Sequence, residues 1–424
     1  MASLKAPRGT QDVLPGESER WQRVEAVARE VMVSFGYREI RTPIFEHTEL
    51  FTRGVGEHTD VVEKEMYTFH DRSGRSITLR PEGTAPVARA YVEHGMHLWP
   101  SPVKVFYIGP MFRYERPQAG RLRQHQQIGA EALGCEDPAL DAEAIVMPME
   151  IFRRLGLSRF VVKLNSIGCP DCRPGYRQAL VAYLRPRESA LCPNCRRRLE
   201  RSPLRVLDCK VPTCREVTAG APSSVDFLCE PCRSHFRTLL GHLDALGARY
   251  EQDPRLVRGF DYYTRTVFEL QAEDLGAQNA VAGGGRYDGL VQAIGGPPTP
   301  GVGFASGVER ALLALPSGVC EPGERWLDVY VAWGESGESD RRALVLLQRL
   351  RQAGFRADAA YGARSLKRQL KAADRAGARV AVIVSPDGTP AAAVVKDLRS
   401  GQQQEVASLE AAEQAVASLL RDGA

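Results

Sequence analysis

Arginines crowd a short stretch between two apolar runs, where they could bind a polyanion. Residues 103–108 are apolar and end at Gly109-Pro110, and residues 126–131 form a second strand-like run. The segment between them carries Arg113, Arg116, Arg121 and Arg123. A loop joining two strands forms a hairpin that can bring guanidinium groups to phosphate or carboxylate groups. A surface hairpin with solvated arginines would show the same pattern, so the rest of the chain must decide.

Two further places carry side chains that could bind a polar ligand. Glu82 and Thr84 follow an alternating strand at 77–80 and precede a helix at 87–94, so they lie at a corner that could accept an ammonium group. Gln127 and Glu131 are four residues apart on a strand and therefore face the same side. Burying them without partners would be unfavourable, which indicates a polar pocket. The alternatives are a helix N-cap by Thr84 and a solvent-facing strand.

Eight of the ten cysteines form four pairs within one short region, which suggests metal binding. The first two pairs have the spacing of a zinc ribbon, and four pairs could supply two tetrahedral sites of four thiolates each. Sequential and interleaved combinations of the pairs are both possible, and reduced thiols without a metal are the alternative. The cysteines are Cys169, Cys172, Cys192, Cys195, Cys209, Cys214, Cys229 and Cys232.

The same cysteine-rich region is basic. A small metal-bound domain with this charge could bind the phosphates of an RNA, whereas a solvated charged helix is the simpler explanation. The basic residues are Arg185, Arg187, Arg196, Arg197, Arg198, Arg201, Arg205, Lys210 and Arg215.

Length and composition set the frame for these sites. The chain of 424 residues can form two or three domains, and its net charge of +4 neither requires nor excludes a nucleic-acid partner. The first 17 residues lack the apolar region of a signal peptide. The sequence also has no uninterrupted run of about 18 apolar residues, which is the length needed to span a membrane. We therefore expect a cytoplasmic protein without a membrane partner, in which clustered cysteines bind metal rather than form disulfides.

The periodicity of apolar residues predicts the elements that position these side chains. Helices are expected at 18–35, 141–155 and 311–315, and strands at 37–43 and 160–164. Residues 316–325 read as a linker. Beyond it, strands at 326–333, 355–360, 380–385 and 392–398 alternate with helices at 339–353, 366–376 and 409–420, which predicts a partly parallel sheet covered by helices.

Several runs resemble one enzyme family. GPMFRYERPQAGRLRQ, from Gly109, is similar to motif 2 of class II aminoacyl-tRNA synthetases, and of histidyl-tRNA synthetases in particular. LVRGFDYY from Leu256 and AGGGRYDGL from Ala282 resemble the two histidine signatures of that family. RPEGT from Arg80 resembles its amino-group site, the strand ending at Pro43 its motif 1, and PGVGFASGVER from Pro300 its motif 3.

The resemblance covers nearly the whole chain and implies an ATP-dependent ligase of protein biosynthesis that charges the tRNA for histidine. It implies catalytic arginines that also bind ATP (Arg113, Arg258 and Arg310), an adenine contact (His125, where relatives commonly have Phe or Tyr), and a histidine site (Glu82, Gly83, Thr84, Gln127, Glu131, Tyr262 and Tyr263). It also implies Mg²⁺ with the ATP and a homodimer near Pro43. The cysteines depart from typical members, so structural Zn²⁺ rests on their spacing alone.

The implied fold is an α+β catalytic domain with an antiparallel sheet of the class II synthetase type. We expect its first part at 1–166, a Cys-rich insertion domain at 167–250, its second part at 251–322, and an anticodon-binding α/β domain at 326–424. Three other functions remain possible: a non-charging regulatory paralogue of a histidine-biosynthesis enzyme, an RNA-binding or sensor module, and another class II synthetase. The complete set of motif residues argues against the first two, and the histidine signatures argue against the third.

Overall fold

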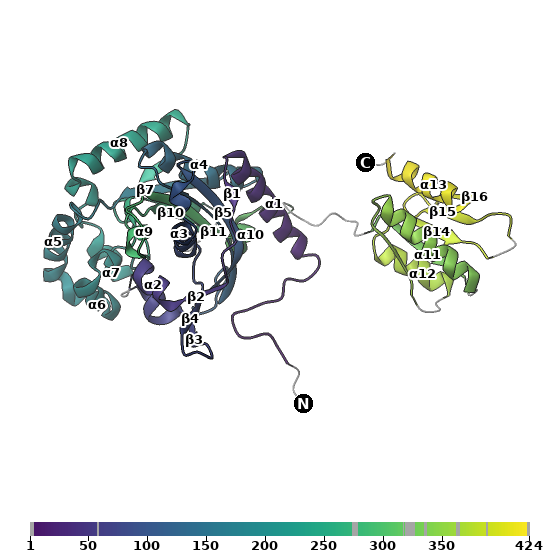
Figure 1. Cartoon of the computed structure of the whole chain (residues 1–424), viewed down its shortest axis with the longest axis horizontal. Coiled ribbons are helices and arrows are strands. Elements are labelled where there is room, and N and C mark those ends of the chain that lie inside the picture. The colour runs from purple at the N-terminus through teal and green to yellow at the C-terminus, as the bar shows by residue number, and fades with distance from the viewer. Residues whose placement is uncertain are drawn as a thin grey trace. The chain divides into compact units, whose positions relative to one another are not determined.

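The computed structural model describes residues 4–56, 59–273, 279–316, 318, 327–334, 337–361, 365–386 and 389–421. The chain forms two compact units, an N-terminal unit of Met1–Cys320 and a C-terminal unit of Glu321–Ala424 (Figure 1). The predicted linker 316–325 lies outside the described residues except at 316 and 318, and the first residue of the strand predicted after it lies outside them too. None of the described helices combines the length and apolar character needed to cross a membrane.

An eight-stranded sheet forms the centre of the N-terminal unit, in the order β1-β5-β6-β11-β10-β9-β7-β8. Its strands are β1 (Arg38–Glu39), β5 (Val103–Phe112), β6 (Gln124–Leu133), β7 (Phe160–Ser166), β8 (Tyr250–Gln252), β9 (Thr264–Ala272), β10 (Ala280–Arg286) and β11 (Gly301–Gly307).

The prediction of an antiparallel sheet is correct for the six central strands and wrong at both edges. β1 pairs with β5, and β8 with β7, in parallel. A parallel pair needs a long crossover connection, and the cysteine-rich region supplies one between β7 and β8. The predicted strand at 37–43 is also reduced to two residues. The sheet is therefore mixed.

Four helices cover one face of this sheet (Figure 1): α1 (Ser18–Ser34), α4 (Pro138–Arg154), α8 (Glu230–Ala245) and α10 (Val308–Ala314). Val24, Val27, Val31 and Met32 of α1 recur at helical spacing and are buried, which confirms the predicted helix. Phe106 of β5 belongs to this core, while the next residue, Tyr107, belongs to the core on the opposite face.

The opposite face carries the functional residues. It packs against α2 (Thr48–Val55), α3 (Thr84–Glu93) and the short α9 (Leu290–Ala293). A small sheet of order β2-β4-β3 lies before α3; its strands are β2 (Phe45–His47), β3 (Tyr67–His70) and β4 (Ser76–Leu79). β4 leads directly into the corner of Glu82 and Thr84, so the predicted strand-to-helix turn is present.

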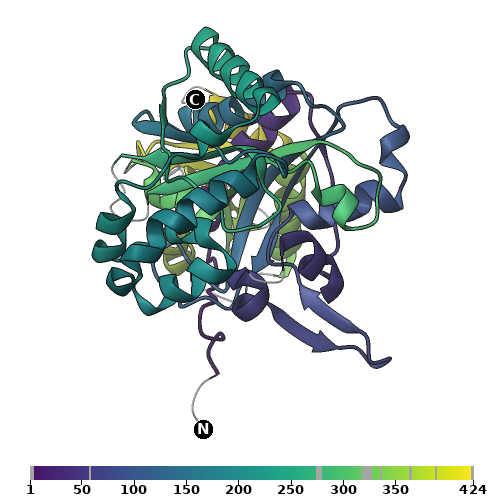
Figure 2. The ribbon, with the colours of Figure 1, turned by 90° about the vertical axis from the view of Figure 1, so that its left-hand side faces the viewer.

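The cysteine-rich region folds as a set of short helices (teal in Figure 2): α5 (Arg173–Leu184), α6 (Pro193–Arg201) and α7 (Pro212–Thr218), followed by α8. Each of α5, α6 and α8 begins directly after a cysteine, with Cys172, Cys192 and Cys229 as the respective N-cap residues. Proline occupies the first or second position of each helix, where the missing N–H has no intrahelical partner to lose. The cysteine motifs therefore also start the helices.

The C-terminal unit is a five-stranded sheet of order β13-β12-β14-β15-β16 with helices packed against it. Its elements are β12 (Val329–Trp333), α11 (Gly337–Gln352), β13 (Ala357–Ala359), α12 (Leu366–Arg375), β14 (Val380–Val384), β15 (Ala393–Asp397), β16 (Gln403–Val406) and α13 (Leu409–Arg421). β12 pairs in parallel with β13 and β14, which confirms the partly parallel sheet. The edge strand β16 was not predicted, because only Val406 of its four residues is apolar and buried.

Candidate active site

A cavity of about 550 Å³ opens on the α3 side of the central sheet, a volume typical of small-molecule sites. Most of the residues predicted for the site line this cavity: Glu82, Thr84, Arg113, His125, Gln127, Glu131, Arg258, Tyr262, Tyr263 and Arg310. Gly83 does not line it. Instead, a Cβ atom at Gly83 would lie 2.2 Å from Cζ of Tyr107, so this glycine makes room for the tyrosine ring.

Three arginines from distant parts of the chain meet at this cavity. Arg113 donates from Nε to the carbonyl of Pro81 at 2.8 Å, and Arg258 donates to Oε1 of Glu269 at 2.7 Å. Arg310 donates to the carbonyl of Ala280 at 2.7 Å. A guanidinium has five N–H donors in a rigid fork, so these bonds orient each arginine at the cavity. The arrangement suits a ligand with several negative charges.

Glu82 lies just before α3 and is buried. Its carboxylate accepts the backbone N–H groups of Thr84 at 2.7 Å and Ala85 at 2.8 Å. Burial nevertheless raises the pKa of Glu82 above its usual value. Thr84 does not cap the helix; its hydroxyl donates instead to Oε1 of Glu131 at 2.7 Å. The simple N-cap explanation for Thr84 is therefore wrong.

Glu131 lines the cavity and is 1% exposed. Besides Thr84, the hydroxyl of Tyr287 donates to it, with 2.6 Å between Oη of Tyr287 and Oε2 of Glu131. Burial raises the pKa of Glu131 to about 8, against the lowering effect of these hydrogen bonds. The site thus holds a carboxyl group in a fixed orientation, ready to accept from or donate to a polar ligand.

The raised pKa predicts that the ligand-free protein loses stability as the pH rises from about 5 to 8. In this range folded Glu131 keeps a proton that the unfolded chain, with a pKa near 4.5, releases. Stability then falls by about 1.4 kcal/mol per pH unit for each extra proton held. Glu131→Gln has no such proton, so urea unfolding should show a smaller loss for the variant between pH 5 and pH 8. Equal losses in both proteins would contradict the raised pKa.

Tyr107 and Tyr287 belong to the site, although neither was among the predicted site residues; Tyr287 lies within the second histidine signature. The ring of Tyr107 lies between Gly83 and Gly129; a Cβ atom at Gly129 would come 2.3 Å from its Oη. The hydroxyl of Tyr107 lies 3.4 Å from Oε1 of Gln127. The signal available was a tyrosine in a strand whose neighbours in space are glycines, but the pairing of those segments cannot be read from one sequence.

An aromatic wall adjoins Arg258. The rings of Tyr262 and Tyr263 lie 4.6 Å apart, and Tyr262 meets Tyr287 edge-on at 5.8 Å. The Cζ atom of Arg258 lies 5.9 Å from the centre of the Tyr263 ring. A Cβ atom at Gly283 would come 2.6 Å from the Arg258 guanidinium, so this glycine makes room for the arginine. Gly283 also lines the cavity, so the glycine run accommodates a protein side chain beside the ligand site.

The hairpin loop uses part of its basic charge internally. Arg121 pairs with Glu115 at 3.2 Å, Arg123 donates to the Glu115 carbonyl at 3.2 Å, and the Arg123 guanidinium lies 3.7 Å from the ring centre of Tyr114. Burial, then repulsion from Arg113, lowers the pKa of His125 to about 3. His125 is therefore neutral at ordinary pH, which suits a ring that stacks on a base.

The cysteines form two groups, and the grouping is nested. Cys169 and Cys172 lie with Cys229 and Cys232, while Cys192 and Cys195 lie with Cys209 and Cys214. Within each group the four sulfur atoms lie within 4.8 Å of one another. The sequential combination, which the spacing also allowed, is not the one that forms.

Part of the basic surface next to these cysteines faces the cavity. Arg198 pairs with Asp60 at 2.7 Å, and Arg205 lies 3.5 Å from the same carboxylate. Both arginines, with Asp208, Cys209 and Lys210, line the cavity. The cysteine-rich region thus contributes one wall of the site, a role that composition alone did not indicate.

Comparison with known proteins gives matches over almost the whole chain. A family model described as Histidyl-tRNA synthetase matches residues 9–170 and 226–311, and one described as Anticodon binding domain matches residues 328–418. A protein named histidine–tRNA ligase from Desulforamulus reducens is 55% identical over 402 residues, which is 94% of this chain and 96% of that protein. One of the same name from Pelotomaculum thermopropionicum is 54% identical over 94% of each chain.

Solved structures are similar to this chain over nearly its whole length. The crystal structure of ligand-free histidyl-tRNA synthetase from S. aureus is 38% identical, with a TM-score of 0.80 over 98% of this chain and 100% of that one. A Bacillus halodurans chain titled ATP phosphoribosyltransferase regulatory subunit/histidyl-tRNA synthetase has a TM-score of 0.67 over 92% of this chain and 100% of that one. At 20% identity, that likeness shows the fold alone.

Proposed function

The chain belongs to the histidyl-tRNA synthetase family, and from this we infer that it is a histidine–tRNA ligase, which attaches L-histidine to its tRNA in an ATP-dependent reaction through a histidyl-adenylate. The observation that carries this inference is the meeting of Arg113, Arg258 and Arg310 with the buried Glu82 and Glu131 in one cavity. The carboxylate of histidine would attack the α-phosphorus of ATP there, and pyrophosphate would leave. No protein nucleophile is needed, so catalysis rests on positioning and on stabilising charge.

The arginines divide the triphosphate between them in this proposal. Arg113 and Arg258 contact the α-phosphate, where charge develops, and Arg310 contacts the γ-phosphate. Arg310 lies in α10, Arg113 follows β5 and Arg258 lies in the loop before β9, so three separate segments supply the arginines. His125, neutral and beside Arg113, is placed to stack on the adenine.

Mg²⁺ would accompany the phosphates, and the cavity offers residues that fit it. Glu115 and Glu309 both line the cavity. Oε1 of Glu309 accepts the backbone N–H of Gln126 at 2.9 Å, whereas its Oε2 is buried and has no hydrogen-bond partner within the described part of the chain. Carboxylate oxygens are the ligands that Mg²⁺ prefers, so these two residues would hold the ion. Bound there, it would neutralise charge on the departing phosphates.

The remaining polar residues define the histidine pocket. Glu82, Thr84 and Gln127 would hold the α-amino end, and Glu131 with Tyr262 and Tyr263 would surround the imidazole. Tyr287 and Thr84 orient the Glu131 carboxyl through their hydrogen bonds, so they would act through Glu131 as positioning residues. A buried hydrogen-bonding site of this kind discriminates strongly against side chains that cannot pair with it.

Each unit would contact its own part of the tRNA. In the second step its terminal ribose hydroxyl attacks the adenylate, and the loop from Arg116 to Arg123 would contact the acceptor end. The C-terminal unit, within which 328–418 match an anticodon-binding domain, would contact the anticodon. We keep the proposed division of the first unit into catalytic parts at 1–166 and 251–322 and an insertion domain at 167–250.

We also propose a homodimer formed near Pro43. Ile44 and Phe45, which follow this proline, are 45% and 58% exposed, so their apolar side chains are available to a partner subunit. The regulatory-paralogue alternative is not favoured, because relatives named as ligases match at 55% identity over nearly the full length.

The test is ATP–pyrophosphate exchange with each of the twenty amino acids, followed by charging of a histidine tRNA transcript. We expect exchange with histidine alone and charging of that tRNA but not of a control tRNA. Exchange with another amino acid would reassign the pocket. An absence of exchange in a protein that is folded and binds histidine would favour the regulatory paralogue.

A further inference from the structure

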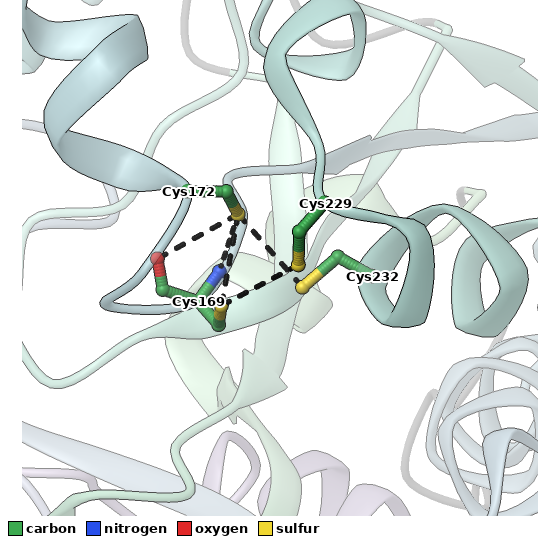
Figure 3. A group of neighbouring side chains, drawn as sticks. All are labelled: Cys169, Cys172, Cys229 and Cys232. Carbon is green, nitrogen blue, oxygen red and sulfur yellow. Dashed lines mark hydrogen bonds between the residues drawn. The ribbon is translucent and has the colours of Figure 1, made fainter.

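The first and last cysteine pairs of the cysteine-rich region form the outer cluster: Cys169, Cys172, Cys229 and Cys232. Figure 3 shows their side chains pointing toward one another from the loop before α5 and from the start of α8. Sγ of Cys169 lies 3.7 Å from that of Cys172 and 3.8 Å from that of Cys229, and Sγ of Cys172 lies 3.9 Å from that of Cys232. Two segments far apart in the sequence thus place four sulfur atoms around one point.

The two middle pairs form the inner cluster: Cys192, Cys195, Cys209 and Cys214. Its sulfur atoms lie within the same 4.8 Å limit, with 3.9 Å between those of Cys192 and Cys209. Cys195 and Cys214 are fully buried. The inner cluster therefore has the same close spacing of four sulfur atoms as the outer one, built from a different part of the chain.

These distances fit one tetrahedral metal ion in each cluster. With zinc–sulfur bonds of about 2.3 Å, the sulfur atoms of a tetrahedral site are separated by about 3.8 Å. A disulfide would need about 2.05 Å, and all eight cysteines are free. A four-iron cluster would hold the sulfur atoms further apart, because each would bind a different iron.

The backbone around the sulfur atoms is also arranged for metal ligands. The N–H of Cys169 points to Sγ of Cys172 at 3.2 Å, and the N–H of Cys192 points to Sγ of Cys214 at 3.2 Å. Such bonds orient the ligands and stabilise their negative charge. Gly168 has a φ angle of +73°, and a Cβ atom there would lie 2.6 Å from Sγ of Cys172. Only glycine lets the chain pass this close to the cluster.

We propose that the outer and inner clusters each bind one Zn²⁺, and that the inner ion holds the wall that the cysteine-rich region contributes to the active-site cavity. The inner cluster packs in the same apolar core as Tyr262, Tyr263 and Tyr287. Cys209 itself lines the cavity, and Cys192 and Cys195 lie at the start of α6, which carries Arg198. Two of the four inner thiols, those of Cys195 and Cys214, are fully buried, and one bound ion would give all four a common partner.

The outer ion has a different task. Cys169 follows β7 and Cys229 precedes α8, so this ion joins the chain where it leaves the central sheet to the chain where it returns. Cys232, in the first turn of α8, is buried in the core that α8 shares with α4. Arg173, next to the cluster, donates to the carbonyl of Tyr263. Metal binding contributes directly to folding in such closed sites, so loss of the outer ion should destabilise the whole N-terminal unit.

Metal analysis of the full-length protein tests the proposal. We expect two zinc ions per chain in the wild type and in Cys135→Ser, which changes a cysteine outside both clusters. Replacing the four inner cysteines by serine should leave one zinc ion, because nested pairing keeps the outer site intact. Trypsin should then cleave faster at Arg196, Arg197, Arg198 and Arg201, because their helix α6 has lost its metal.

The opposite results are equally clear. No zinc in the inner variant would show sequential pairing, in which both sites lose ligands, and two ions would show that the inner cysteines bind none. Iron in place of zinc, or a wild type with fewer than two ions, would also overturn the proposal. If the variant does not fold, Co²⁺-substituted wild type should show two equivalents of tetrahedral thiolate absorption, and a single equivalent would refute the second site. Unchanged trypsin cleavage in a folded one-zinc variant would refute the role in the wall.

Discussion

Replacement of Arg258 by alanine is expected to lower histidine-dependent ATP–pyrophosphate exchange by about 10²- to 10³-fold, mainly through kcat. The guanidinium donates to Glu269 and occupies the space that Gly283 leaves open, so its donors are oriented before substrate binds. Glu269 keeps a partner in the variant, because Gln271 donates to it at 3.1 Å. The fold should therefore survive, and the loss should reflect charge that is no longer stabilised when pyrophosphate leaves.

Two companion variants make this experiment specific. Arg255→Ala removes a nearby arginine that is 42% exposed and lies outside the cavity, so its exchange rate should stay close to that of the wild type. Arg258→Lys keeps the charge but not the fork, and should recover only part of the activity. Near-normal exchange by Arg258→Ala, in a protein with unchanged unfolding, would remove Arg258 from the chemistry.

The sequence predicted the residues of this site better than it predicted their contacts. Glu82 could be selected because it lies at a strand-to-helix corner. Gln127 and Glu131 could be selected because they face the same side of an apolar strand, where polar side chains need partners. The hydrogen bond from Thr84 to Glu131 joins residues 47 positions apart, and that from Tyr287 joins residues 156 positions apart. Alternation along a strand shows which side a residue faces, but not which strand becomes its neighbour.

The cysteines show the same limit. Their spacing predicts pairs that bind metal, and it left sequential and interleaved combinations of the pairs open, whereas the structure has a nested one. What decides is topology: β7 ends just before Cys169, and α8 must return to pack on α4, which brings Cys229 and Cys232 to the first pair. The parallel β7–β8 edge has the same cause, because the chain re-enters the sheet after this crossover. Local patterns could not contain this information.

Replacement of Glu131 by glutamine is expected to lower kcat/KM for histidine by about 10²-fold or more, with KM for ATP nearly unchanged. The amide has almost the same shape, and the hydroxyls of Thr84 and Tyr287 can donate to its oxygen or accept from its nitrogen, so the pocket should keep its form. It cannot take up or balance the proton of an imidazole. Breaking one side of a buried charge-assisted pair typically costs about 2–5 kcal/mol.

The control for Glu131→Gln is Glu136→Gln. The Glu136 side chain is 72% exposed, and its carboxylate lies 3.9 Å from the guanidinium of Arg265. It should leave both constants within about twofold of the wild type, because exposed ion pairs contribute little. If Glu131→Gln kept its kcat/KM for histidine, the imidazole would not be read by this carboxyl, and Tyr262 and Tyr263 would have to supply the selectivity. A loss confined to the ATP constants would place Glu131 in the nucleotide half of the cavity instead.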